Sequence, residues 1–118
     1  ATDFPGADKK SAGDIALGEG PVLAVGANIN PVLGGLLQTA ARAKKIPFQL
    51  EGEPRATGTD ANAIQISRAG VAAALLSVPN RYMHTPVEVV HEKDVDNAAK
   101  LLAEVCLRID RKTDFIPR

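Results

Sequence analysis

The sequence predicts an α/β domain, a layered sheet with helices on both faces. Three observations support this fold class. Short apolar runs bounded by glycine or proline alternate with longer segments of helical periodicity, as strands alternate with helices. The 118 residues, 45% of them hydrophobic, suffice for one core and are too few for two. With a single cysteine, no internal disulfide can replace packing, so the fold must rest on that core.

The first strand and the first long helix are predicted by local signals. Glycines and prolines in the first twenty residues indicate turns and extended chain rather than a long helix. Residues 20–26 form a short apolar run between turn formers, as a buried strand does. Asn30 can then cap a helix with Pro31 at its first position, and apolar residues spaced three and four apart extend that helix to Lys45.

The middle of the chain predicts two strands separated by a short helix. Residues 48–51 alternate apolar and polar side chains, which indicates a strand with one less protected face, near a sheet edge. A helix capped by Thr59 or Asp60 follows and extends to Arg68. Residues 71–78 are apolar at both parities, so we expect them to form the central strand, covered on both faces.

The last helix is predicted to open at Asp94 and Asp96, because carboxylates stabilise a helix N-terminus. Its apolar stripe comprises Val95, Ala98, Leu101, Leu102, Val105 and Ile109. Cys106, on the same helix, is interpreted as a core residue. Ligands of such sheets bind beyond the C-terminal ends of strands, so we expect the chemistry in the loops 52–60 and 79–91.

Composition and charge exclude several classes of function. The 14 basic residues balance the 14 acidic ones, so the surface lacks the basic field that attracts nucleic acid or an anionic membrane. Aromatic residues make up 3% of the chain, too few for platforms that stack bases or sugars. No apolar run approaches the roughly 20 residues that span a bilayer. We therefore expect a soluble, cytoplasmic protein with no nucleic-acid or membrane partner.

The richest polar segment follows residues 71–78 and contains His84 four residues before Glu88. Imidazole is a common transition-metal ligand, and a nearby carboxylate often holds such a ring in place. The alternative is a surface loop in which His84 bonds only to its neighbours, and spacing alone favours that alternative. A second candidate is residues 58–61, whose exposed backbone amides suit an anionic group, although an ordinary helix cap has the same sequence.

Taken in order, the motifs of the chain resemble those of one enzyme family. The motifs are Asp3-Phe4-Pro5-Gly6, Gly18-Glu19-Gly20-Pro21, Asn28-Ile29-Asn30-Pro31, Ile46-Pro47-Phe48-Gln49, Gly58-Thr59-Asp60-Ala61 and residues 77–90. The chain resembles the C-terminal catalytic portion of the glutamyl aminopeptidases, also called deblocking or TET aminopeptidases. The resemblance covers nearly the whole chain, and residues 81–88 are its most specific part. It implies that residues 1–118 are the C-terminal half of a dizinc-aminopeptidase-like (phosphorylase/hydrolase-like) catalytic domain.

The resemblance also implies an activity and its site residues. Members of the family hydrolyse N-terminal residues from peptides with a water activated by two divalent metal ions, zinc or cobalt. His84 matches a metal ligand of the family, and we expect Glu88 to support it. The residues that match the substrate cleft are Gly58, Thr59, Asp60 and Arg81.

By the same resemblance, most of the active centre lies outside the chain. The family's other histidine ligand, its bridging aspartate, its general-base glutamate and its other carboxylate ligands all lie upstream of Ala1, and its dimerisation domain is absent. We therefore expect an inactive fragment, without a catalytic residue of its own, from a homo-oligomeric parent. One histidine cannot hold a metal pair, which leaves a non-catalytic α/β module for binding or assembly as an alternative. A glycoside hydrolase is less favoured, because it needs two positioned carboxylates and usually aromatic platforms.

Overall fold

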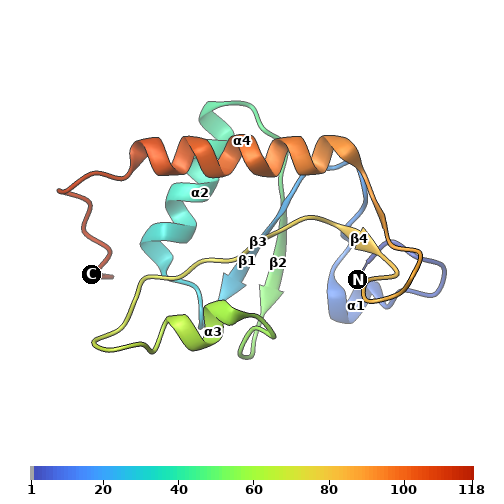
Figure 1. The fold of residues 1–118 in the computed structure, drawn as a ribbon, viewed down its shortest axis with the longest axis horizontal. Coiled ribbons are helices and arrows are strands. Elements are labelled where there is room, and N and C mark those ends of the chain that lie inside the picture. Colours follow the sequence, from blue (N-terminus) through green and yellow to red (C-terminus); the bar gives the residue numbers. More distant parts are fainter. Residues whose placement is uncertain (1) are drawn as a thin grey trace.

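The sheet is built on a βαβ unit, seen in a computed structural model that describes residues 2–118 (Figure 1). β1 (Val22–Gly26) and β2 (Gln49–Glu53) pair in parallel, and α2 (Pro31–Ala43) connects them. β3 (Leu76–Ser77) pairs antiparallel with the other edge of β1, which gives the strand order β2-β1-β3. The predicted α/β class is confirmed.

Four of the remaining elements are short: α1 (Lys9–Ala12), α3 (Asp60–Ile64), and the antiparallel pair β4 (Asn80–Arg81) and β5 (Val89–Val90). The last element is the long helix α4 (Glu92–Arg108). α3 ends before the predicted Arg68, because the chain turns between residues 65 and 70. Within the part of the chain that the structure describes, no helix is long and apolar enough to cross a bilayer.

α2 begins where its sequence signals predict. The side-chain oxygen of Asn30 accepts a hydrogen bond from the Leu33 N–H at 3.0 Å, which satisfies one of the free amides at the helix start. Pro31 occupies the first position, where its missing N–H costs nothing. The helix ends at Ala43, slightly before the predicted Lys45.

Both long helices share one hydrophobic core with the sheet. The buried cluster comprises Leu23, Leu37, Ala40, Ala41, Ile46, Leu101 and Val105. Leu23 belongs to β1, and Leu76 of β3 packs against the cluster from the same side. The sequence predicts helices on both faces of the sheet. In the structure, α2 and α4 both contribute to the core on the face that carries Leu23. Because alternate strand residues point to opposite faces, Val22 and Ser77 belong to the other face, where the candidate site lies.

Residues 71–78 differ most from their prediction. Only residues 76–77 are in a strand, and that strand lies at a sheet edge, while β1 is central. The segment still follows β1, because the Leu75 carbonyl accepts a hydrogen bond from the Ala24 N–H at 3.1 Å. Apolar residues at both odd and even positions indicate that side chains are covered on both faces of the strand. This pattern says nothing about which edges find a backbone partner, and so the prediction of a central strand was wrong.

β2 lies at a sheet edge, as the alternation of residues 48–51 predicts, with β1 as its neighbour. The strand itself is displaced toward the C-terminus and runs to Glu53. Its polar face, which carries Gln49 and Glu51, is half-buried, while Leu50 on the other face is exposed. The polar residues of this strand therefore point toward protein rather than toward solvent.

α4 differs from its prediction at its start and in the width of its buried stripe. It begins at Glu92, with His91 as its cap, because the His91 Nδ1 accepts a hydrogen bond from the Lys93 N–H at 3.2 Å. The predicted stripe residues that are buried are Ala98, Leu101 and Val105, and those that are exposed are Val95, Leu102 and Ile109. Cys106 is also exposed, so its interpretation as a core residue was wrong.

Candidate functional site

The hairpin formed by β4 and β5 carries His84 and is held together by Glu88. One carboxylate oxygen of Glu88 accepts a hydrogen bond from the His84 backbone N–H, and the other accepts one from Asn80 Nδ2 at 3.3 Å. Tyr82 and His84 both adopt positive φ angles, 58° and 65°. This left-handed backbone is unfavourable for most residues, so the Glu88 contacts stabilise a loop that would otherwise relax.

The imidazole of His84 is free to bind a ligand. The residue is exposed, and neither ring nitrogen has a hydrogen-bond partner in residues 2–118. Glu88 contacts the backbone of His84 and not its ring. Across the described residues, no group of three or more His, Cys, Asp and Glu side chains could hold a metal ion. A metal ion bound at His84 would therefore need its other ligands from outside the described residues.

The Glu88 contacts predict a pH-dependent hairpin. The hydrogen bond from the His84 N–H, and then that from Asn80, hold the pKa of Glu88 below its ordinary value of 4.5. A carboxyl whose pKa is lowered on folding stabilises the folded state above its unfolded pKa, and this contribution is lost as the pH falls through the lowered value. In an NMR titration, the His84 amide proton is therefore expected to shift with a midpoint below 4.5. Glu88→Gln should abolish that transition, and a wild-type midpoint at or above 4.5 would contradict the assignment.

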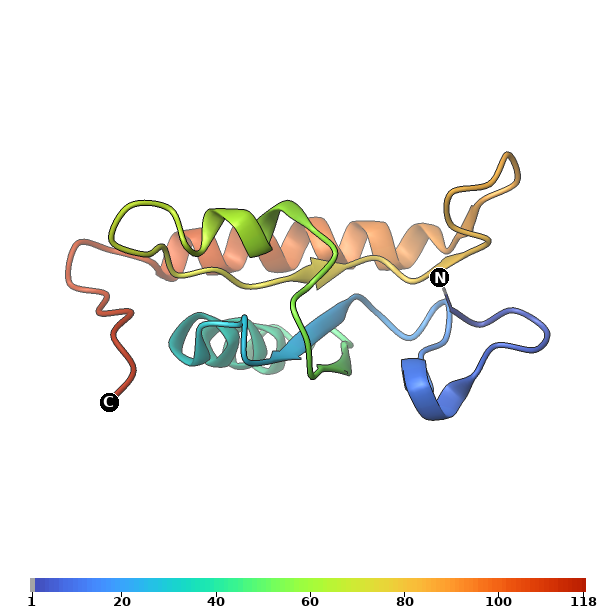
Figure 2. The same cartoon turned by 90° about the horizontal axis from the view of Figure 1, so that it is seen from below.

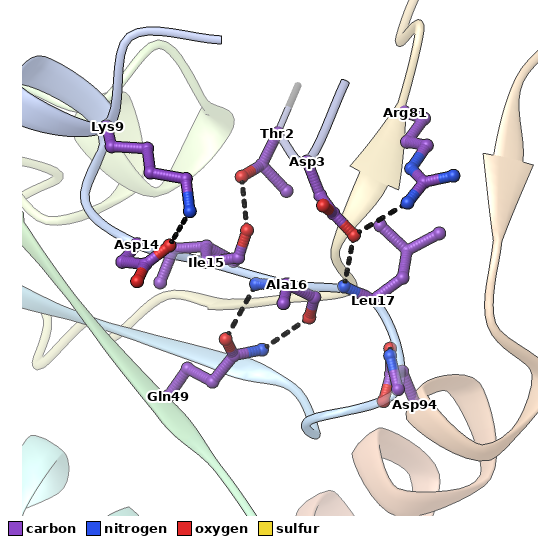
Figure 3. A network of polar contacts seen from close by, with 11 residues as sticks. Thr2, Asp3, Lys9, Asp14, Ile15, Ala16, Leu17, Gln49, Arg81 and Asp94 are labelled. Carbon is purple, nitrogen blue, oxygen red and sulfur yellow. Dashed lines mark hydrogen bonds and ion pairs between the residues drawn. The ribbon is translucent and has the colours of Figure 1, made fainter. Parts of the chain in front are cut away.

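Arg81 joins the hairpin to the N-terminal segment (Figure 3). Its Nη2 lies 3.0 Å from Asp3 Oδ2, which also accepts a hydrogen bond from the Leu17 N–H at 3.0 Å. The bond from Leu17, and then that from Arg81, lower the pKa of the Asp3 carboxyl. Nearby, the Gln49 side chain bonds both the N–H and the carbonyl of Ala16 at 2.9 Å. Figures 1 and 2 show the N-terminal segment beside this hairpin, at the opposite end of the molecule from the C-terminal tail.

A cavity of about 300 Å³ lies on the sheet face opposite the core. Its floor includes Val22 and Ser77, and its walls come from the two loops in which the sequence predicts the chemistry. Gly58 and Thr59 line it from the first loop, and Met83, the neighbour of His84, lines it from the second. The structure therefore brings the two predicted loops together at one cavity.

The predicted cleft residues divide into two pairs. Gly58 and Thr59 line the cavity. Asp60 is the first residue of α3 and Arg81 bonds to Asp3, and neither is among the lining residues. These two residues lie within the loop and hairpin that form the cavity walls.

Several polar groups that line the cavity have no hydrogen-bond or ion-pair partner in residues 2–118. Glu51 and Glu53 line it from β2, and alternate strand residues share a face. Neither carboxylate forms an ion pair with a Lys or Arg in the described chain. Burial, and then the neighbouring charge of Glu53, raise the pKa of the Glu51 carboxyl. Asn80 also lines the cavity, and its buried Oδ1 has no hydrogen-bond partner in residues 2–118.

Sequence reasoning did not select Glu51, Glu53 or Asn80. The polar face of residues 48–51 was visible as a less protected strand face, and its position directly before a candidate loop was the available signal. The side chains that share this cavity come from segments 22–26, 49–59 and 75–83, whose juxtaposition depends on strand register rather than on local sequence.

The chain is similar in sequence to one family of known enzymes. The sequence pattern of the M42 glutamyl aminopeptidases matches residues 1–101. A lysyl aminopeptidase of Pyrococcus furiosus is 52% identical over 101 residues, which are 86% of this chain and 29% of that protein.

Two solved structures have the same fold. The TET aminopeptidase from the marine sediment archaeon Thaumarchaeota archaeon SCGC AB-539-E09 has a TM-score of 0.85 at 31% identity, covering 95% of this chain and 32% of that one. PhTET1-12s, described as a dodecamer, has a TM-score of 0.72 at 29% identity, covering 85% of this chain and 30% of that one.

The similarity has the same extent in each of these comparisons. It covers most of this chain, while the chain spans about a third of the length of the proteins it matches. The resemblance inferred from the sequence motifs is confirmed, because the family pattern extends over residues 1–101 and the fold agrees. The chain belongs to the M42 glutamyl aminopeptidase family.

Proposed function

We propose that residues 1–118 are the C-terminal part of the catalytic domain of a metal-dependent aminopeptidase, which removes N-terminal residues from peptides. One observation carries the proposal: in a chain of this family, the unpaired imidazole of His84 stands on a clamped hairpin beside a cavity. The match to the M42 glutamyl aminopeptidase family favours this proposal over a non-catalytic module for binding or assembly.

The proposal assigns each site residue a role. His84 coordinates one of two divalent metal ions, zinc or cobalt, together with ligands from the rest of the parent. When bound, such a metal pair polarises the scissile carbonyl and lowers the pKa of a water nucleophile. Glu88 holds the backbone of His84, and Gly58 and Thr59 line the cleft.

The other two cleft residues are given positioning roles within this proposal. Asp60 sets the start of α3, and Arg81 holds the hairpin against the N-terminal segment. The general base lies outside this chain, so the 118 residues alone are expected to be inactive.

The proposal extends to partners and location. The parent acts on peptides in the cytoplasm and assembles as a homo-oligomer, which the dodecameric form of the similar PhTET1-12s supports. The balance of 14 basic and 14 acidic residues supports the absence of nucleic-acid and membrane partners. The preferred N-terminal residue does not follow from the comparisons, because the family description names a glutamyl residue and the 52% identical relative a lysyl one.

Metal removal tests the proposed function. The full-length parent, dialysed against a chelator, is expected to lose its hydrolysis of aminoacyl p-nitroanilides and to regain it when zinc or cobalt is added. The isolated 118-residue chain should be inactive under the same conditions. If the metal-loaded parent cleaves none of these substrates, the proposal fails, and cleavage of a β-glucan instead would favour the glycoside hydrolase alternative.

A further inference from the structure

We propose that Asp3 is a positioning residue for the metal site: by holding Arg81, it fixes the hairpin of β4 and β5, which then presents the His84 imidazole to the metal ion from a constant position. This inference rests on the proposed aminopeptidase function and adds a residue that is not among the predicted site residues. Its evidence is the register between the N-terminal segment and the hairpin, the anchoring of Asp3 itself, and the scarcity of other contacts that hold the hairpin.

Three consecutive residues of the N-terminal segment contact three consecutive residues of the hairpin. The pairs are Thr2 with Asn80, Asp3 with Arg81, and Phe4 with Tyr82. The first is a backbone hydrogen bond of 2.9 Å, the second an ion pair of 3.0 Å, and the third a contact of two rings whose centroids lie 6.1 Å apart, within the range at which aromatic side chains attract. Because both segments advance by one residue from contact to contact, the N-terminal segment follows the hairpin in a fixed register up to the residue pair that precedes His84.

Asp3 is anchored to the body of the protein as well as to the hairpin (Figure 3). The oxygen that faces Arg81 also accepts a hydrogen bond from the Leu17 N–H at 3.0 Å. The segment that contains Leu17 is bonded in turn to β2, because Gln49 contacts both backbone groups of Ala16. The carboxylate therefore lies between a segment that the sheet holds and the guanidinium of the hairpin.

Beyond its base, the hairpin has few other contacts to hold it. In residues 2–118, the side-chain hydrogen bonds of residues 82–88 all stay within residues 80–88. Tyr82 and His84 both have left-handed backbone conformations, which a free loop would relax. A loose hairpin occupies several orientations, and a metal ion binds only the fraction that places the imidazole correctly, which weakens the apparent affinity in proportion. The contact of Asp3 with Arg81 raises that fraction before the metal binds.

The test measures the zinc affinity of the full-length parent by competition with a chromogenic chelator. Asp3→Asn keeps the side-chain shape and tolerates the φ of 53° at this residue, but it removes the charge that binds Arg81. This variant is expected to bind zinc about 10-fold more weakly, the lower end of what groups around a metal ligand contribute. At saturating zinc, its kcat and KM on Leu p-nitroanilide should return to within about twofold of wild type, because the metal then selects the competent orientation.

The matched control is Asp14→Asn in the same segment. Asp14 pairs with Lys9 at 2.6 Å, and in the described chain no hydrogen bond or ion pair joins Asp14 to the hairpin. Its loss should leave the zinc affinity unchanged. Arg81→Gln should weaken zinc binding by a factor similar to that of Asp3→Asn, and the double variant should lose no more than about twofold beyond Arg81→Gln, because residues that act only through each other are not additive. Losses that multiply would overturn the assignment of Asp3 to this pair.

The remaining outcomes separate this inference from the proposed function. Unchanged zinc affinity in Asp3→Asn would overturn the inference and leave the aminopeptidase function standing. Unchanged affinity with a loss of activity that saturating zinc does not restore would also overturn it, since Asp3 would then act elsewhere than at the metal. A wild-type parent that binds no zinc and cleaves no substrate would overturn the proposed function itself.

Hydrogen exchange on the wild-type parent tests the inference without a variant that could misfold. Coupling between two sites is reciprocal, so a metal that favours the positioned hairpin also favours the contacts that position it. Zinc should therefore slow exchange at the Leu17 amide, which donates to Asp3, as well as at the His84 amide. Slowing at His84 without slowing at Leu17 would overturn the inference.

Discussion

His84→Ala is expected to lower kcat/KM of the full-length parent by about 10³-fold or more on every peptide substrate. A metal ion contributes several kcal/mol to the stabilisation of transition-state charge, and each 1.36 kcal/mol is a factor of ten in rate. The variant should also lose bound metal, measured by elemental analysis after gel filtration. The loss should be uniform across substrates, because it removes the metal and not a side-chain contact.

Two further variants separate the loss of a metal ligand at His84 from a disturbance of the hairpin backbone. Because His84 has a φ of 65°, alanine could also disturb the hairpin, whereas asparagine tolerates this left-handed backbone. His84→Asn should therefore lose metal and activity to a similar extent while keeping the hairpin. His91→Asn is the matched control, since asparagine can replace the imidazole as the cap of α4. If His84→Asn keeps both its metal content and its activity, His84 is not a ligand.

The parts of the fold that sequence predicts well depend on signals close together in the chain. Asn30 and Pro31 mark the start of α2 by themselves, because a cap acts on amides within three residues. The loops 52–60 and 79–91 were predicted from the α/β pattern, and the role of His84 as a metal ligand stays a prediction. Residues 71–78 were misjudged, since whether a strand is central depends on neighbours that its own sequence does not contain.

The surroundings of the polar cavity residues likewise depend on segments that are distant in the sequence. Whether Glu51 faces solvent or a cavity depends on which loop folds over that face of β2. The segment before β1 also reaches this face, through the hydrogen bond between Gln49 and Ala16, which are 33 residues apart. A strand with polar residues on one face is common, and only the assembled structure shows that here the face is half-buried and shares a cavity with Met83 of the hairpin.

Asp94→Ala is expected to lower the free energy of unfolding by about 3–5 kcal/mol. The Asp94 side chain is fully buried, at 0% exposure, in the first turn of α4. Its two carboxylate oxygens accept hydrogen bonds from the N–H groups of Gly18 at 2.7 Å and Gly20 at 2.9 Å. Alanine would leave both amides without a partner, at about 1–3 kcal/mol each, and would remove a favourable charge from the helix N-terminus.

The control variant for the hydrogen bonds of Asp94 is Asp96→Ala, on the same helix. Asp96 is exposed, and its loss is expected to change the free energy of unfolding by less than about 0.5 kcal/mol. Asp94→Asn should fall between the two, because one amide oxygen can still accept while the NH₂ group meets an N–H donor. Urea denaturation followed by circular dichroism measures all three. A loss below about 1 kcal/mol for Asp94→Ala would mean that the turn finds other partners.

The Asp94 contact also connects stability to the cavity. Gly18 and Gly20 have φ angles of 85° and 98°, and a Cβ on Gly20 would lie 2.2 Å from the Pro47 carbonyl oxygen. Only a glycine turn fits there, and it is ordered by the Asp94 carboxylate on its amides and by Gln49 Nε2, which donates to the Gly20 carbonyl at 2.9 Å. This turn leads directly into β1, where Val22 forms part of the cavity floor. In Asp94→Asn, hydrogen exchange should therefore accelerate at the Gly18 and Gly20 amides and extend into the start of β1. If exchange accelerates only within α4, the carboxylate stabilises its own helix and does not position the floor of the cavity.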